Sequence, residues 1–277
     1  MATTSPTFTP AEASLFLTLC GRALDSRQEH SILHDTTASE IVERTGTNTA
    51  DYPHAKTGMR DIALRAKKLD GVVRDFIAVH PNSVVVDLGA GLDSRMIRVD
   101  PPSTVDWYDV DLPKVIAARR KLLPQPANAH FVAADVADLS WIDELPTDRP
   151  AVIVADGLVA FLAQPALTAA LRGLTAHFPE GEIAFNGYTR FHVWALKHYK
   201  GTNSIADAVA NPGFDDPHAP ERWNPDLTLV EEILLSRAPE VAGYPLFMRL
   251  ATRLAALSTA WSRRGTTVVR YRFAREG

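Results

Sequence analysis

Short apolar segments alternate with longer amphipathic segments over most of the 277 residues. Segments 84–88, 104–109, 129–134, 151–155 and 182–186 are mostly apolar or β-branched, which is typical of strands. Segments of helical period separate several of them, and this alternation predicts a parallel sheet. We therefore expect an α/β fold.

Apolar residues spaced three and four apart predict the helices. The longest covers 57–79, and the charged residues in its middle, which are Arg65, Lys67, Lys68 and Asp70, favour a solvent-exposed face. A second helix is expected to reach Arg44, with Thr36 or Thr37 as its N-cap. Other helices are expected to begin at Ala11 and to cover 113–123, 165–177 and 245–262.

The last third of the chain predicts two more strands, at 227–235 and 266–273. We expect the second of them at the end of the sheet and antiparallel to its neighbours. Before them, a segment of about 188–225 carries interleaved aromatic and histidine residues and then a polar loop. Those side chains could line a pocket or pack a cap helix on the sheet.

Residues 83–95 carry the most informative pattern, because a buried strand runs into Gly89 and Gly91 and a helical pattern follows. Glycine permits positive φ and a close approach of backbone to ligand, and ligands of such sheets bind at the carboxyl ends of the strands. A dinucleotide fingerprint would place a third glycine where Ser94 stands. The pattern favours S-adenosylmethionine over a dinucleotide, and a purely structural turn is the other alternative.

Three aspartates follow three successive predicted strands, and each could bind one part of that cofactor. Asp111, favoured over Asp109, could accept hydrogen bonds from ribose hydroxyls. Asp135 could accept from the adenine amino group, and Asp156 could hold the ammonium of the methionine part. The guanidinium of Arg65 suits the methionine carboxylate. Further cofactor-binding candidates flank these positions: Ala90, Leu112 and Val136.

Composition narrows the class of protein. Apolar residues make up 46% and charged residues 22%, as in ordinary globular proteins. A net charge of −4 without a Lys/Arg run argues against nucleic-acid binding. No apolar run approaches the roughly 20 residues that cross a membrane, and the N-terminus lacks the basic region of a signal peptide. We expect a cytoplasmic protein without a disulfide, since Cys20 is the single cysteine, and without a metal site.

Several segments in the same order resemble the leucine carboxyl methyltransferase family: 63–70, 88–95, 107–113 and 155–162. The similarity is closer to its bacterial branch of polyketide-type O-methyltransferases. Residues 22–26 and Asp35 also resemble the N-terminal motif of that branch. The resemblance implies a class I S-adenosylmethionine-dependent methyltransferase with a Rossmann-like, mostly parallel seven-stranded sheet. It also implies cofactor contacts from Arg65, Gly89, Asp111 and the acid at 156.

The same resemblance implies an N-terminal helical cap over 1–82 and a cofactor-binding domain over 83–277. An inserted cap segment of about 188–225 would follow the fifth strand, within a single structural unit. Three positions depart from the family: Asp156 replaces the usual glutamate, Phe161 the usual tyrosine and Asn186 the usual aspartate. Because the last two face the expected acceptor side, we include them with Trp194 as candidate substrate-binding residues.

The expected reaction transfers a methyl group to a small-molecule natural-product acceptor and leaves S-adenosylhomocysteine. The expected atom is a carboxylate or hydroxyl oxygen. A carboxylate is already ionised at neutral pH, whereas a hydroxyl needs a base, for which His192, Tyr188 and His30 are candidates. The alternatives are transfer to nitrogen, an aromatic carbon or a protein C-terminus, a non-catalytic binding protein, and a nicotinamide oxidoreductase. A homodimer is compatible with the sequence.

Overall fold

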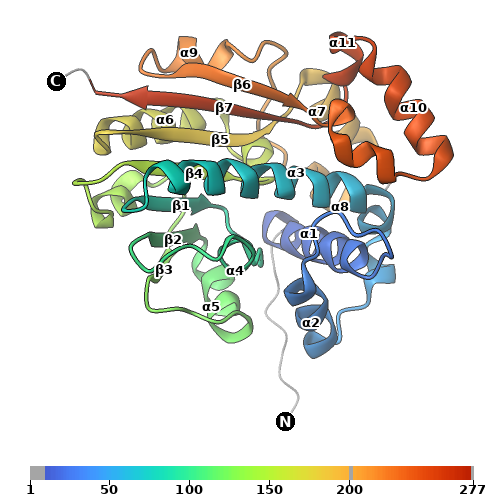
Figure 1. Cartoon of the computed structure of the whole chain (residues 1–277), viewed down its shortest axis with the longest axis horizontal. Helices are drawn as coiled ribbons and strands as arrows, with labels where there is room; N and C mark the ends of the chain where they lie inside the picture. Colours follow the sequence, from blue (N-terminus) through green and yellow to red (C-terminus); the bar gives the residue numbers. More distant parts are fainter. Residues whose placement is uncertain (1–9, 200–201, 276–277) are drawn as a thin grey trace.

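A seven-stranded sheet forms the centre of the computed structural model, which describes residues 10–199 and 202–275. Its order is β3-β2-β1-β4-β5-β7-β6 (Figure 1). The strands are β1 (Val84–Leu88), β2 (Asp106–Asp111), β3 (Ala129–Ala133), β4 (Ala151–Ala155), β5 (Glu180–Gly187), β6 (Thr228–Leu234) and β7 (Thr267–Ala274). The first five pair in parallel, and β7 is antiparallel to both β5 and β6. The expected α/β, mostly parallel, seven-stranded fold is confirmed.

The position expected for the last strand was wrong, although its antiparallel direction was right. β7 lies between β5 and β6, so β6 forms the edge. Tyr271 of β7 is fully buried, whereas most of β6 is exposed or half-buried, with Glu231 and Glu232 on it. Charged side chains suit an edge strand, because they oppose pairing with another chain.

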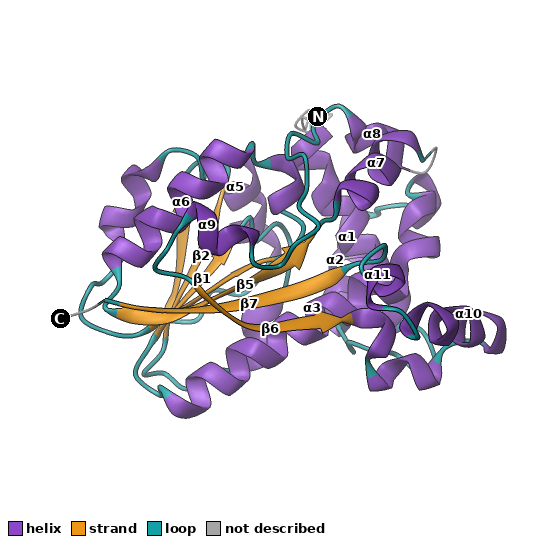
Figure 2. Cartoon of the chain, turned by 90° about the horizontal axis from the view of Figure 1, so that it is seen from above, coloured by secondary structure: helices purple, strands orange, loops and turns teal. Residues whose placement is uncertain are grey.

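Helices cover both faces of the sheet (Figure 2). The helices are α1 (Pro10–Ser26), α2 (Thr36–Thr45), α3 (Pro53–Val79), α4 (Arg95–Val99), α5 (Pro113–Leu122), α6 (Gln164–His177), α7 (Arg190–His198), α8 (Asn203–Ala206), α9 (Ala219–Trp223), α10 (Leu246–Ala256) and α11 (Thr259–Ser262). Short 3-10 helices lie at Thr49–Asp51, Leu139–Glu144, Val159–Phe161, Leu235–Arg237 and Pro239–Gly243. The single helix expected over 245–262 is thus divided into α10 and α11.

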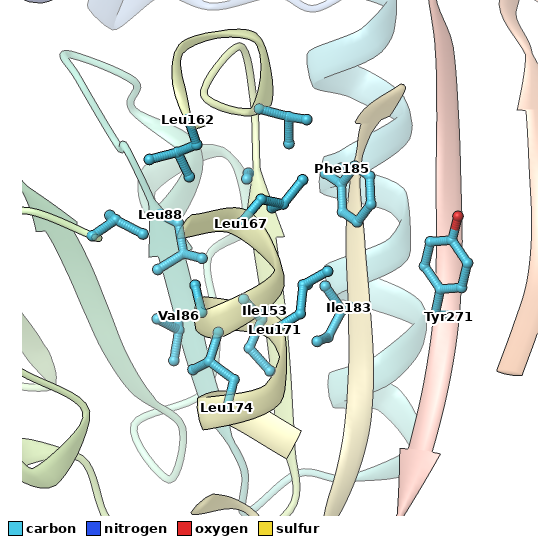
Figure 3. Packing of buried hydrophobic residues seen from close by; sticks show 14 of the residues in the cluster. Val86, Leu88, Ile153, Leu162, Leu167, Leu171, Leu174, Ile183, Phe185 and Tyr271 are labelled. Atoms are coloured by element: carbon cyan, nitrogen blue, oxygen red, sulfur yellow. The ribbon is translucent and has the colours of Figure 1, made fainter. Parts of the chain in front are cut away.

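Alternate residues of the central strands face opposite layers. On one face, Val86 and Ile153 pack against leucines of α6, as Figure 3 shows. On the other face, Val85 and Val152 pack in one cluster with Leu69 and other residues of α3. Both faces of β1 and β4 are therefore buried, which explains their continuous apolar sequences.

Two local expectations need correction. The N-cap of α2 is Asp35, whose side chain accepts a hydrogen bond from the Ala38 backbone N–H, and neither Thr36 nor Thr37 takes that position. In α3, Arg65 and Asp70 are buried rather than exposed. Their burial follows from partners supplied by other segments, described below.

The division of the chain into 1–82 and 83–277 stays a prediction, and residues 1–9 and 200–201 of the expected segments lie outside the described residues. α1 and α2 pack on each other and α1 packs on α3, which extends along the sheet (Figure 1). Within the described part of the chain, no helix is long and apolar enough to cross a membrane. A homodimer and a cytoplasmic location stay predictions.

Candidate active site

A cavity of about 530 Å³ lies at the carboxyl ends of the parallel strands. Residues of β1 and β2 and of the turns after β1, β3 and β4 line it, together with residues of α1, α3 and α7. Its volume falls within the range of about 300–1,000 Å³ that is usual for small-molecule sites. The position is the one where ligands bind in open α/β sheets.

The glycine turn after β1 forms one wall of this cavity. Gly89 and Gly91 have φ of 63° and 52°, in the left-handed region that favours glycine. A Cβ at Gly89 would come within 3.0–3.3 Å of three side-chain atoms of Leu158. Beneath the turn, Arg119 Nη1 donates to the carbonyl oxygens of Ala90 and Gly91 at 3.1 and 3.0 Å. The other side of the same guanidinium pairs with Asp109, which is buried.

Asp111 is the last residue of β2 and lines the cavity beside the glycine turn. Its Oδ2 accepts from the Gly91 N–H and its Oδ1 from the Leu112 N–H, both at 2.7 Å. Burial raises the pKa of Asp111, and the two backbone N–H groups oppose that rise. A carboxylate has about four acceptor positions, so both oxygens can accept further hydrogen bonds from a ligand.

Arg65 of α3 and Asp156, just after β4, form a buried ion pair in the cavity wall. Arg65 Nε lies 2.7 Å from Asp156 Oδ1, and both side chains are more than nine-tenths buried. The direction is unsuitable for a hydrogen bond, and neither atom has a hydrogen-bond partner among the described residues. Burial opposes the charge of Arg65, but Asp156 raises the pKa of Arg65 above its ordinary value. Gly157 follows Asp156 with a φ of 82°, in the left-handed region that favours glycine.

A network of buried charges supports these walls, and two of its members, Asp93 and Arg95, also line the cavity. Arg98 Nη1 lies 2.9 Å from Asp35 Oδ2 and 2.6 Å from Asp93 Oδ1. Asp70 accepts from Arg95 Nη1 at 2.7 Å and from Arg98 Nε at 2.8 Å. The network joins α2, α3, the glycine turn and α4. This network was not predicted from the sequence, where the available signal was the recurrence of Asp and Arg in segments 22–35 and 87–98.

Residues after β5, residues of α7 and the residues just before β7 also line the cavity. Tyr188 and His192 line it, with ring centroids 5.1 Å apart. Asp61 of α3 also lines it, and its Oδ2 accepts from Thr266 Oγ1 at 2.8 Å. Burial raises the pKa of Tyr188 and lowers that of His192. Asp61, Thr266 and the lining residue His54 were not identified from the sequence, because only the fold brings them beside His192.

The model of leucine carboxyl methyltransferases matches residues 16–175. The tetracenomycin polyketide synthesis O-methyltransferase TcmP of Streptomyces glaucescens is 35% identical over 84% of this chain and 86% of its own. The chain belongs to the leucine carboxyl methyltransferase family. It is an S-adenosylmethionine-dependent methyltransferase, as the family recognised from the sequence implies.

Solved structures support the fold of this methyltransferase. A presumed methyltransferase of Thermobifida fusca aligns with a TM-score of 0.54 and 16% identity, covering 92% of this chain and 94% of its own. The plantazolicin methyltransferase BamL, solved with S-adenosylhomocysteine, aligns with a TM-score of 0.51 and 11% identity, covering 96% and 98%. At these identities the likeness concerns the class I methyltransferase fold alone.

The described residues fit the cofactor of this family. The unmet hydrogen-bonding atoms of the Arg65–Asp156 pair suit the carboxylate and ammonium of its methionine part. Gly91, whose φ is positive, and the carboxylate of Asp111 line the same cavity. Asp135, which is exposed, and Val136, which is buried, line it after β3. When bound, the cofactor supplies an electrophilic methyl group on a sulfonium.

Most of the expected site residues of this methyltransferase line the cavity, and three do not. The cavity-lining ones are Arg65, Gly89, Ala90, Gly91, Asp111, Leu112, Asp135, Val136, Asp156, Phe161, Tyr188 and His192. His30 is exposed, and Trp194 of α7 is 56% exposed. Asn186 is buried, and its Oδ1 accepts from the Gly157 N–H at 2.7 Å, so it supports the turn after β4.

Proposed function

We propose that this methyltransferase transfers a methyl group to an oxygen atom of a small-molecule acceptor in a natural-product pathway. The observation that carries the proposal is one cavity that is lined both by the residues we assign to the cofactor and by further side chains. Arg65 and Asp156 belong to the first group, and Tyr188 and His192 belong to the second. The O-methyltransferase of tetracenomycin polyketide synthesis, at 35% identity, supports oxygen as the accepting atom.

The order of strands in the sheet suggests how the ligands lie. Asp135 and Asp156 lie just after β3 and β4, and we assign them to adenine and methionine; Asp111 is the last residue of β2, and we assign it to ribose. β5 and β7 continue the sheet beyond β4, and Tyr188, just after β5, and Thr266, just before β7, line the space that we assign to the acceptor. Phe161, after β4, also lines the cavity. Alignment of the acceptor oxygen with the methyl group, about 3 Å apart, is the main catalytic task.

Two measurements test this function. Calorimetric titration should give binding of S-adenosylmethionine and S-adenosylhomocysteine and none of NADPH. Incubation with S-adenosylmethionine and a hydroxynaphthoic acid, which offers a phenol and a carboxylate on one scaffold, should add one methyl group to oxygen, located by mass spectrometry and NMR. Cofactor binding without methylation of either oxygen, while the matching aminonaphthoic acid is methylated on nitrogen, would contradict the proposal.

A further inference from the structure

Helix α10 presents its apolar side to solvent rather than to the protein. None of its residues is buried, and the side that packs on the rest of the chain carries the half-buried residues Thr252, Ala255 and Ala256. The large apolar residues of the helix and its C-cap lie on the opposite side, with exposed fractions of 52–83%: Leu246, Phe247, Leu250, Leu254 and Leu257. A surface helix ordinarily turns its apolar side to the core.

The exposed apolar surface continues beyond α10. Trp261 of α11 is 58% exposed, and Phe191 and Trp194 of α7 are 47% and 56% exposed. The rings of Phe191 and Trp194 stack with centroids 5.9 Å apart. The guanidinium of Arg264 lies 5.4 Å from the ring centroid of Phe191 and 5.8 Å from that of Trp261, and so connects α7 with α11. These three aromatic residues and the exposed apolar residues of α10 form what we call the α10 surface. α10 itself lies at the outer edge of the molecule (Figure 1, Figure 2).

The charge around the α10 surface is positive, although the net charge of the chain is −4. Segment 241–275 contains arginines and neither Asp nor Glu. Within the described part of the chain, Arg249, Arg253 and Arg264 belong to no ion pair. The α10 surface therefore suits a partner that is negatively charged and can also cover apolar side chains.

An anionic lipid bilayer has both properties. Helices that carry arginine beside a face of leucine, phenylalanine and tryptophan lie in the surface of such a bilayer, with the apolar face at the boundary of the acyl chains. Tryptophan is favoured at the level of the headgroups. Arginine can reach lipid phosphates while its carbon atoms stay beside apolar side chains. A helix docked in this way lies along the bilayer and does not cross it.

A second copy of the chain is a poorer partner for this surface. A symmetric pair brings the same surface of both copies together. Arg253 and Arg264 of one copy would then face arginines of the other, and segment 241–275 supplies no carboxylate to separate them. Like charges that face each other oppose association.

An acidic protein is also less suitable, because the exposed side of α10 offers few groups that could direct its binding. Protein interfaces contain about one hydrogen bond per 100–200 Å². From Leu246 to Leu257, the exposed apolar side carries no side-chain donor or acceptor, and Arg253 stands at its border. Lipid hydrocarbon requires no such groups.

We propose that the α10 surface docks this methyltransferase on an anionic lipid bilayer. The apolar side chains of α10 enter the boundary of the acyl chains, and Arg253 and Arg264 bind lipid phosphates. Gly265 and Thr266, directly after Arg264, line the cavity, as does His192 of α7. Docking therefore holds one wall of the cavity close to the membrane, where apolar acceptors accumulate. No residue of the α10 surface lines the cavity, so docking is separate from the choice of accepting atom.

Flotation with lipid vesicles tests the docking. The full chain should float with vesicles of equal parts phosphatidylcholine and phosphatidylglycerol. It should bind vesicles of phosphatidylcholine alone at least about tenfold more weakly, because arginines near an anionic surface contribute to binding. Binding should also weaken as the salt concentration rises, since salt screens these charges. Equal binding to both kinds of vesicle, or binding to neither, would overturn the proposal.

Variants of α10 separate the apolar and the charged contributions. Phe247→Ser should weaken binding to the anionic vesicles about tenfold, because it removes an 83% exposed side chain that lipid would bury. Arg253→Gln should weaken it about fivefold and leave binding to phosphatidylcholine unchanged. Two matched controls should bind normally: Val79→Ser, at the 73% exposed last residue of α3, and Lys121→Gln, at an exposed residue of α5. Equal losses in the variants and the controls would overturn the role of α10.

Tryptophan fluorescence gives a second readout. Trp261 and Trp194 are exposed, whereas Trp107 and Trp141 are buried. Adding the anionic vesicles should move the emission to shorter wavelengths, and Trp261→Phe should reduce that shift. Calorimetry with S-adenosylhomocysteine verifies that each variant is folded. Flotation without any shift in emission would place the lipid contact on another surface and overturn the proposal.

Analytical ultracentrifugation examines the alternative of a second copy. Phe247→Ser should sediment with the same mass as the unmodified protein. A dimer that Phe247→Ser dissociates, together with an absence of vesicle binding, would identify a second copy as the partner and overturn the proposal.

Discussion

The carboxylate of Asp111 accepts hydrogen bonds from the glycine turn, and we expect the same carboxylate to bind the ligand. In Asp111→Ala, the Gly91 and Leu112 N–H groups lose their acceptor, and ribose hydroxyls lose a charged partner. We expect S-adenosylhomocysteine to bind about ten- to hundredfold more weakly, or about 1.4–2.8 kcal/mol, by calorimetry. The control is Asp148→Ala, whose side chain is 76% exposed and which should bind normally. Unchanged affinity in Asp111→Ala would remove Asp111 from the cofactor site.

Gly89 illustrates why the turn needs glycine. Alanine at φ 63° costs about 1–2 kcal/mol, and its Cβ would press on Leu158. Gly89→Ala should therefore lower the free energy of unfolding, measured in urea, by at least that amount. Gly71→Ala is the matched control in α3, where a Cβ meets no atom within 4 Å, and should raise it by about 0.5–1 kcal/mol. Equal effects of the two substitutions would contradict the conformational argument.

The junction of α3 with α4 depends on buried charge rather than on apolar packing alone. Asp70 accepts hydrogen bonds from Arg95 and Arg98; Asp70 and Arg95 are buried, and the side chain of Arg98 is 8% exposed. Asp70→Ala leaves two buried guanidinium groups short of a partner, and we expect a loss of about 3–5 kcal/mol in the free energy of unfolding. Glu43→Ala removes an exposed ion pair with Arg27 and should change it by less than about 1 kcal/mol. A comparably small loss for Asp70→Ala would mean that solvent reaches the network.

The elements buried on both faces were the easiest to predict from sequence. β1 and β4 have the expected bounds because a strand covered on both sides must be apolar at every position. The glycine turn and the acids at the strand ends were also recognisable, because each stands at a fixed distance along the chain from such a strand. Their sequence positions alone were enough to predict where these residues lie.

Features that depend on partners distant in sequence could not be predicted in this way. The burial of Asp70 follows from Arg95 and Arg98, and a helical pattern alone assigns a charged residue to solvent. Likewise, no local pattern distinguishes a strand inserted between β5 and β6 from one added at the edge. The grouping of Asp61 with His192 required the packing of α3 against the ends of β5 and β7.

The cavity joins parts of the chain that are far apart in sequence, so ligand binding should stabilise the molecule well beyond the glycine turn. Leu15 and Thr18 of α1, Arg65 of α3 and His192 of α7 all line it. S-adenosylhomocysteine at one hundred times its Kd should raise the free energy of unfolding by about 2.7 kcal/mol, measured by thermal or urea unfolding.

Amide hydrogen exchange can locate that stabilisation. Exchange should slow in the turns 89–93 and 156–158 and also in α1 and α3. The bound ligand holds these walls in their closed arrangement, so each of them opens less often. α10 is the internal control: none of its residues lines the cavity, and its Leu250 and Leu254 are exposed, so its exchange should not change. Protection confined to the glycine turn would contradict a cavity shared by the two ends of the fold. Protection of α10 as well would mean that the ligand stabilises the molecule only by suppressing global unfolding.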